Sequence, residues 1–153
     1  MNQSKKAFTM IELIFVIVIL GILAAVAVPR LAATRNDANV ATAAQNIMTA
    51  AGEIASYAVS NGGVVGDLSV MSNAISSMLA TGIAVLDIGN QKASIKIGQE
   101  SDCVDIFIVT GVDDDNLTIA FKTPTLDSQC LNLQSKIDAQ KFPMQLRGSL
   151  IKE

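Results

Sequence analysis

The feature that most constrains this chain is an apolar stretch close to its N-terminus. Residues 13–28 contain no polar side chain, and the carboxylate of Glu12 directly precedes them. A helix from Phe8 to Pro29 rises by about 1.5 Å per residue, or roughly 32 Å, which matches a hydrocarbon thickness near 30 Å. An ionised carboxylate inside a bilayer costs on the order of 2.5 to 3.5 kcal/mol, so something should compensate the charge of Glu12.

Two ordinary interpretations of this stretch leave Glu12 unexplained. The first is a secretory signal peptide, with Lys5 and Lys6 as the basic region and a small-residue cleavage site at 25–27, so that the exported chain begins at Val28. The second is a plain membrane anchor with the basic residues inside and the rest of the chain exported. The length of the stretch fits both interpretations.

A capping box accounts for part of the placement of Glu12. Thr9 and Glu12 have the T-x-x-E spacing that satisfies free amides at a helix start.

A third interpretation of the apolar stretch adds a positive charge that can pair with Glu12. If the chain is cut between Ala7 and Phe8, the new α-amino group lies four residues before Glu12, and in an assembly the amine of a neighbouring copy can pair with this carboxylate. The buried charge then sets the register between subunits.

The basic leader, the Ala7-Phe8 junction and the segment "FTMIELIFVIVILGILAAVAVP" resemble the class III signal of type IV pilins and of the pseudopilins of type II secretion. The resemblance spans residues 4–35. It implies that a prepilin peptidase cleaves before Phe8 and N-methylates it, and that Glu12 is needed for subunit assembly. Ala7 stands where the family usually has Gly, and a residue this small should still be accepted.

Gly21 and Pro29 are the helix-weakening positions of the anchor. Gly costs up to about 1 kcal/mol against Ala in a helix interior, and Pro removes a backbone hydrogen bond at roughly 3 kcal/mol or more. A tolerated membrane kink is one interpretation. Pilins similar to this chain carry Gly and Pro around a segment that can unwind in filaments, and our hypothesis is that residues 21–29 stretch on assembly.

The remaining pattern predicts an α+β fold with a long N-terminal α-helix packed on a small antiparallel sheet. The helix should run from about Phe8 to Ser60 and end at Asn61-Gly62-Gly63. Its apolar stripe in the second half comprises Val40, Ala44, Ile47, Met48, Ala51, Ile54, Ala55 and Ala58. We therefore divide the chain into a leader peptide (1–7), a transmembrane or filament-core helix (8–30) and a periplasmic pilin-like domain (31–153).

A second helix is predicted from about Leu68 to Ala80, and beyond it the apolar period changes to two. About four strands are expected from the alternating residues Ile83, Val85, Ile95, Ile97, Val104, Ile106, Ile108, Leu117, Ile119, Phe121, Leu131 and Leu133. This α+β arrangement is also what the resemblance implies.

Cys103 and Cys130 are the only cysteines, and both follow the anchor on the exported side, where thiols are oxidised. We interpret them as a structural disulfide rather than as two free thiols. Many type IV pilins carry a comparable Cys-bounded loop near the C-terminus, although here 23 residues follow Cys130.

The acidic run at 111–116 joins two strand-like segments, 104–110 and 117–122, and is typical of a hairpin turn. A calcium site is the alternative. It would use Asp113 and Asp115, with Asp102 or Asp105 as further ligands, and major pseudopilins of type II secretion are similar in holding calcium in this region. No spacing here matches a defined ligand motif, so no cofactor is expected apart from this possible calcium.

Composition argues against an enzyme and against direct nucleic-acid binding. The chain has no His and no recognisable nucleophile-base pair, phosphate loop or metal cluster. Beyond Lys5 and Lys6, 9 basic residues stand against 14 acidic ones, a poor balance for binding phosphate backbones. An anchored enzyme therefore has no residue constellation to support it.

The expected function is that of a structural subunit of a type IV filament, serving adhesion, twitching or DNA uptake. The alternatives are a type II secretion pseudopilin and an exported binding module released by general signal peptidase. Expected partners are other pilin or pseudopilin subunits, prepilin peptidase and an inner-membrane assembly platform. The chain should cross the inner membrane once, with its N-terminus cytoplasmic and its C-terminal domain periplasmic, before it enters a filament.

Overall fold

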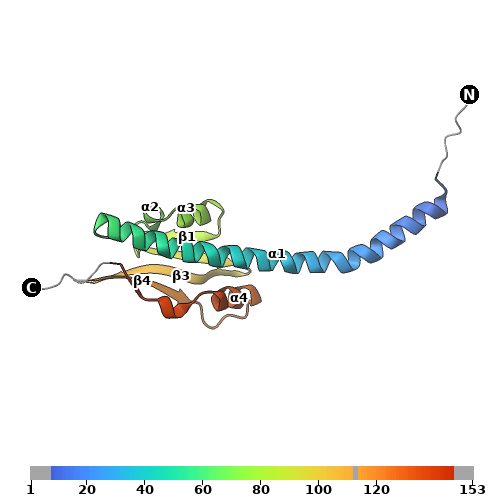
Figure 1. The fold of residues 1–153 in the computed structure, drawn as a ribbon. Helices are drawn as coiled ribbons and strands as arrows, with labels where there is room; N and C mark the ends of the chain where they lie inside the picture. The colour runs from blue at the N-terminus through green and yellow to red at the C-terminus, as the bar shows by residue number, and fades with distance from the viewer. Residues whose placement is uncertain (1–7, 112–113, 147–153) are drawn as a thin grey trace, which may run out of the picture. The chain divides into compact units, whose positions relative to one another are not determined.

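The computed structural model describes residues 8–111 and 114–146 (Figure 1). It consists of two units, one ending at Asp37 and one beginning at Ala38. The elements in chain order are α1 (Met10–Asn61), α2 (Leu68–Met71), α3 (Asn73–Ala80), β1 (Ala84–Asp87), β2 (Lys92–Ile97), β3 (Glu100–Thr110), β4 (Asp115–Phe121), α4 (Ser128–Lys136), the 3-10 helix η1 (Ala139–Lys141) and β5 (Met144–Gln145).

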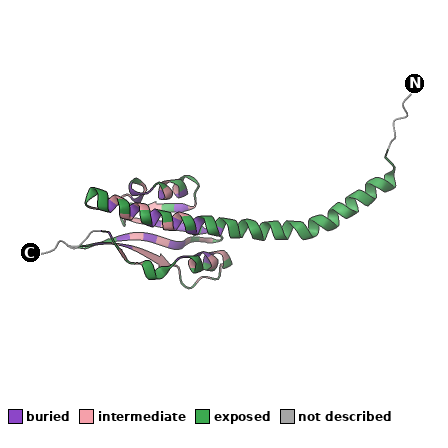
Figure 2. Ribbon diagram, viewed as in Figure 1, coloured by how far each residue is buried: buried purple, intermediate pink, exposed green. Residues whose placement is uncertain are grey.

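The first unit contains the apolar part of α1, and all of its described side chains are exposed (Figure 2). The large apolar side chains there are between 42% (Ile19) and 87% (Phe8) exposed. By length and composition α1 is suited to cross a membrane, and no residue of its most apolar window is buried by the protein. A helix that is apolar all round and uncovered by its own chain needs lipid or other helices around it.

The part of α1 in the second unit is amphipathic. Its buried positions recur every three or four residues: Val40, Ala43, Ala44, Ile47, Ala50, Ala51, Ile54 and Ala58. The predicted stripe is largely confirmed, but Met48 and Ala55 are only partly buried at the edge of the core. The predicted stop is also confirmed, because α1 ends at Asn61, Gly62 has a φ of 71°, and the amide of Gly63 donates to the carbonyl of Ala58 at 3.1 Å.

The sheet is an antiparallel meander in the order β1-β2-β3-β4-β5. About four strands were expected, and the fifth is the two-residue β5, which pairs with Asn116 and Leu117 of β4. Along β3 the alternate residues Val104, Ile106 and Ile108 are buried in the same core as the apolar stripe of α1. The α+β fold is therefore confirmed, with α1 and the sheet sharing one core.

One predicted helix is two. The segment expected to run from Leu68 to Ala80 is broken at Ser72, which has extended backbone dihedrals and lies between α2 and α3. The hydroxyl of Ser72 accepts from the amide of Ile75 and donates to Glu53 of α1 at 2.6 Å. The same Glu53 oxygen accepts from the amide of Ala74 at 3.0 Å. The apolar period gave no sign of this break, because the side chain that holds it comes from a distant helix.

The strand assignment of Leu131 and Leu133 is wrong, since both lie in α4. Asp127 caps this helix by accepting from the amides of Gln129 and Cys130. Residues two apart point to different sides of a helix, and accordingly Leu133 is fully buried while Leu131 is 51% exposed. The two leucines mimic strand alternation by chance, and the Asp before them was the signal for a helix start.

Candidate functional site

Glu12 lies in the first turn of α1 and forms the predicted capping box with Thr9. Its Oε2 atom accepts from the backbone amide of Thr9 at 2.8 Å and from the Thr9 hydroxyl at 2.7 Å. In return the amide of Glu12 donates to Thr9 Oγ1 at 3.3 Å. Both hydrogen bonds of the Glu12 side chain use Oε2, so the cap leaves the second carboxylate oxygen, Oε1, available for another donor.

The surroundings of Glu12 are apolar and uncovered by the described part of this chain. Phe8, Met10, Ile11 and Leu13 all lie more than half exposed beside it. Ala7, on the other side of the expected cleavage junction, lies outside the described residues. A carboxylate in this setting can accept a charge-assisted hydrogen bond from an amine, and such a bond is strong where water is excluded.

The helix-weakening positions do not interrupt α1 in this structure. Pro29 lies inside the helix, and a Cβ added at Gly21 would meet nothing within 4 Å. Thus Gly21 is not required by packing within the described chain. The stretching of residues 21–29 on assembly stays a prediction.

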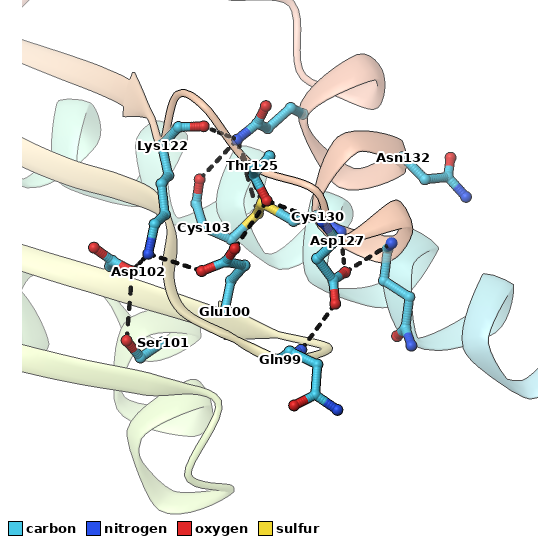
Figure 3. The surroundings of a disulfide bond; sticks show 12 residues. Gln99, Glu100, Ser101, Asp102, Cys103, Lys122, Thr125, Asp127, Cys130 and Asn132 are labelled. Atoms are coloured by element: carbon cyan, nitrogen blue, oxygen red, sulfur yellow. Dashed lines mark hydrogen bonds and ion pairs between the residues drawn. A yellow bond between two sulfur atoms is a disulfide. The ribbon is translucent and has the colours of Figure 1, made fainter.

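The predicted pairing of Cys103 with Cys130 is present, and it ties β3 to α4 (Figure 3). Both cysteines are fully buried. The side-chain amide of Gln134 lies against the disulfide and donates to the carbonyls of Cys103 at 3.0 Å and Lys122 at 3.1 Å. The disulfide is therefore part of the packed structure, and this burial supports a structural role.

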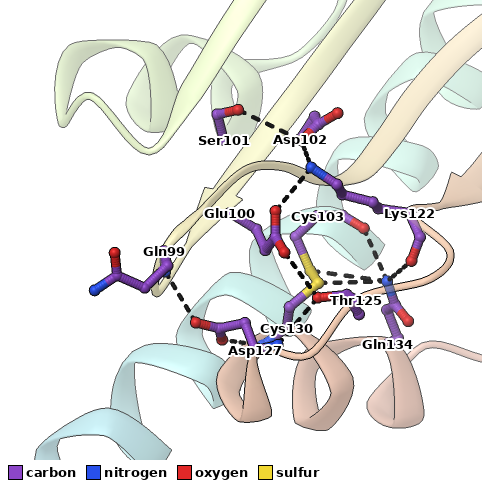
Figure 4. A network of polar contacts seen from close by, with 10 residues as sticks. All are labelled: Gln99, Glu100, Ser101, Asp102, Cys103, Lys122, Thr125, Asp127, Cys130 and Gln134. Carbon is purple, nitrogen blue, oxygen red and sulfur yellow. Dashed lines mark hydrogen bonds and ion pairs between the residues drawn. A yellow bond between two sulfur atoms is a disulfide. The ribbon is translucent and has the colours of Figure 1, made fainter.

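An ion-pair network lies beside Cys103, where the disulfide-bounded loop 103–130 begins (Figure 4). The ammonium of Lys122 lies 2.7 Å from Glu100 and 2.7 Å from Asp102. Glu100 also accepts from the hydroxyl of Thr125 at 3.0 Å. Hydrogen bonds from Lys122 lower the pKa of Glu100 and of Asp102, and the two carboxylates raise the pKa of Lys122. Sequence reasoning missed this network, because its members are brought together only by the register of β3 and β4.

Asp127 holds the chain in place near Cys130, at the C-terminal end of the loop 103–130. Its carboxylate accepts from the amide of Gln99 at 3.0 Å as well as capping α4, and these backbone hydrogen bonds lower its pKa. The carboxylate lies over Gly98, where an added Cβ would come within 2.6 Å of both carboxylate oxygens. The turn between β2 and β3 thus leaves space for the cap of α4.

We expect Gly98→Ala to destabilise the folded domain by about 2 to 3 kcal/mol, because the left-handed backbone costs roughly 1 to 2 kcal/mol and the methyl group displaces Asp127. Gly82→Ala is the matched control, since Gly82 also has a positive φ, 71°, but an added Cβ there meets nothing within 4 Å. Urea denaturation should show the larger loss for Gly98→Ala. Equal losses would mean that the contact with Asp127 contributes nothing.

The segments on either side of the acidic run pair antiparallel as β3 and β4, which supports the predicted hairpin, although Asp115 and Asn116 of the predicted turn already belong to β4. The calcium site considered at this run stays a prediction. Asp113 lies outside the described residues, and Asp115 is buried in β4. Asp102 is paired with Lys122, and Asp105 is paired with Lys92 at 2.7 Å. Within residues 8–111 and 114–146, no group of three or more metal-binding side chains is present.

Residues 2–28 match the family model described as the prokaryotic N-terminal methylation motif. No curated protein and no solved structure gives a significant match to this chain. The matched residues include residues 2–7 of the leader, the Ala7-Phe8 junction, Glu12 and all of the apolar stretch at 13–28. This motif is the signature of type IV pilins and pseudopilins, so the comparison supports a prepilin-like substrate of prepilin peptidase that assembles with other subunits of this kind.

Proposed function

We propose that this chain, which carries the signature of type IV pilins and pseudopilins at residues 2–28, is a structural subunit of a type IV filament. The observation that carries the proposal is the placement of Glu12. It is the single charged residue within residues 8–29, which are apolar and exposed, and it lies four residues after Phe8, the expected new N-terminus. The function is assembly rather than catalysis.

Processing supplies the partner that Glu12 lacks. Cleavage before Phe8 creates an α-amine, and the neighbouring subunit presents Oε1 of Glu12 while Thr9 keeps Oε2 in the capping box. Pairing these groups outside water offsets the cost of burying each charge. An assembly platform in the inner membrane lifts each subunit. The subunit stops rising at the position where the α-amine of one copy meets the Glu12 carboxylate of its neighbour.

The apolar side chains of α1 lose little of their burial when the subunit moves from the membrane into the filament. The side chains of α1 that lie in hydrocarbon in the membrane enter an equally apolar bundle of sister helices in the filament. The exposed residues of α1 before Val40 supply this surface. The same helix therefore serves as anchor and as filament core.

Mass analysis of the purified protein from the native cell tests the proposal. We expect a mature chain that begins at Phe8 and carries one additional methyl group on its N-terminal amine. A chain that begins at Val28 would overturn the proposal in favour of an exported binding module. A chain that keeps residues 1–7 would also overturn it, because no α-amine would lie near Glu12.

A pilin is favoured over a secretion pseudopilin by the disulfide-bonded loop between Cys103 and Cys130. The modest length and the acidic turn favour the pseudopilin, in which a short filament drives protein export. A deletion strain distinguishes them. Loss of long surface fibres supports the pilin, and retention of secreted enzymes in the periplasm supports the pseudopilin.

A further inference from the structure

Two arginines follow the apolar stretch and have no role in the assembly described above. Arg30 comes directly after Pro29, and Arg35 lies five residues further along α1. They are the only basic residues between Ala7 and Lys92. Both are exposed, in the last part of α1 before its first buried residue, Val40.

Neither arginine takes part in the ion pairs of the described residues. Those pairs use Lys92, Lys122 and Lys141 as cations, all in the second unit. The two guanidinium groups are thus presented outward from the helix. Arginine is suited to a planar, bidentate contact with a phosphate or carboxylate, which lysine makes only as a point charge.

Depth in the membrane favours phosphate as the partner. A span from Phe8 to Pro29 fills the hydrocarbon core, so Arg30 begins the next layer and Arg35 lies roughly 9 Å beyond Pro29. The headgroup layer adds about 5 to 8 Å on each side of the core. Flexible arginine side chains reach into this layer from both positions.

Direction around the helix favours lipid over a second copy of the chain. At 3.6 residues per turn, positions 30 and 35 point about 140° apart. A single acidic surface on one neighbour cannot face both guanidinium groups at this angle, whereas lipid headgroups surround a membrane-spanning helix on every side. Each arginine therefore meets a separate headgroup.

We propose that Arg30 and Arg35 bind the phosphate groups of lipids in the periplasmic leaflet and hold the unassembled subunit at a fixed depth. This inference rests on the membrane insertion that is part of the proposed function. The contacts are released when the subunit is lifted into the filament. Before that step, the contacts of the two arginines oppose movement of the helix toward the periplasm. The apolar side chains alone do not fix the depth of the periplasmic end of the membrane-spanning segment.

Solid-state NMR on the full chain in lipid vesicles tests this inference. The sequence has three arginines, so a chain with Arg147→Lys and 13C at arginine Cζ reports on Arg30 and Arg35 alone. In vesicles of phosphatidylcholine and phosphatidylglycerol, we expect 31P to dephase both Cζ signals. Arg30→Gln should remove one signal and leave the dephasing of the other unchanged.

Two controls separate the lipid from other sources of the signal. In phosphate-free detergent supplied with inorganic phosphate we expect no dephasing, and dephasing there would overturn the assignment to lipid. Cysteine labelled with 13C at Cβ provides the internal control, because Cys103 and Cys130 are the only cysteines of the chain, are fully buried and should show no contact with 31P.

The outcomes distinguish this inference from the proposed function. If the chain resists alkaline extraction from the vesicles but its arginines show no 31P contact, the inference is wrong and the filament proposal stands. Contact with the 13C-labelled carboxylates of a second copy, in place of 31P, would likewise overturn it. Release of the chain by alkaline extraction would overturn the anchor itself, and with it both proposals.

Discussion

Glu12→Val is expected to be cleaved normally before Phe8 and to assemble no filaments. The substitution leaves the apolar helix intact and removes the carboxylate that would pair with the α-amine of a neighbour. Removing one partner of a buried ion pair costs about 3 to 5 kcal/mol. At 1.36 kcal/mol per factor of ten, this weakens each subunit contact by roughly 10² to 10⁴-fold. Electron microscopy of sheared surface fractions measures the result.

Glu12→Gln separates the charge from the capping box. Glutamine at this position can still accept from the amide and hydroxyl of Thr9, since the capping box tolerates Glu or Gln. We expect Glu12→Gln to fail in assembly as Glu12→Val does, because it also lacks the charge. Filaments from Glu12→Gln at wild-type abundance would show that the cap, and not the ion pair, determines assembly.

Membrane insertion provides the control for both variants. Because an ionised carboxylate is costly in the bilayer, replacing it should strengthen membrane retention rather than weaken it. Mature protein should therefore accumulate in the inner-membrane fraction and begin at Phe8. A variant that is absent from the membrane would report a defect in targeting and would leave the assembly step to be measured on another substitution, such as Glu12→Ala.

The double variant Cys103→Ala, Cys130→Ala is expected to lose roughly 3 to 4 kcal/mol of stability. The disulfide closes a loop with a sequence separation of 27, and the estimate follows from the entropy that the cross-link removes from the unfolded chain. For a domain of this size we expect the thermal midpoint to fall by at least about 10 °C. Circular dichroism melting of the detergent-solubilised chain checks this.

The loss should begin at α4, which the disulfide attaches to β3. Gln134 and Leu133 remain as contacts, but neither is covalent. Hydrogen exchange should therefore show loss of protection in α4 before loss in β3. Ser128→Ala, at an exposed position of α4, is the matched control and should change stability by less than about 0.5 kcal/mol. Uniform loss of protection across the sheet would contradict a local role for the disulfide.

Local signals in the sequence were sufficient for much of the fold. The apolar period located α1 and its stop at Asn61, because helix and strand periodicities survive in any context that buries one face. These periodicities failed where a side chain distant in the sequence determines the backbone conformation. Glu53 holds the break between α2 and α3, and only the folded chain brings it to Ser72.

The candidate site divides in the same way. The junction at Ala7-Phe8 and the position of Glu12 are matters of residue order along one helix, so the sequence alone determines them. The network of Lys122 with Glu100 and Asp102, and the cap of α4 over Gly98, depend on strand register and were decided by the tertiary structure. Contacts within one helical turn can be read from spacing, whereas contacts across strands exist only after the chain has folded.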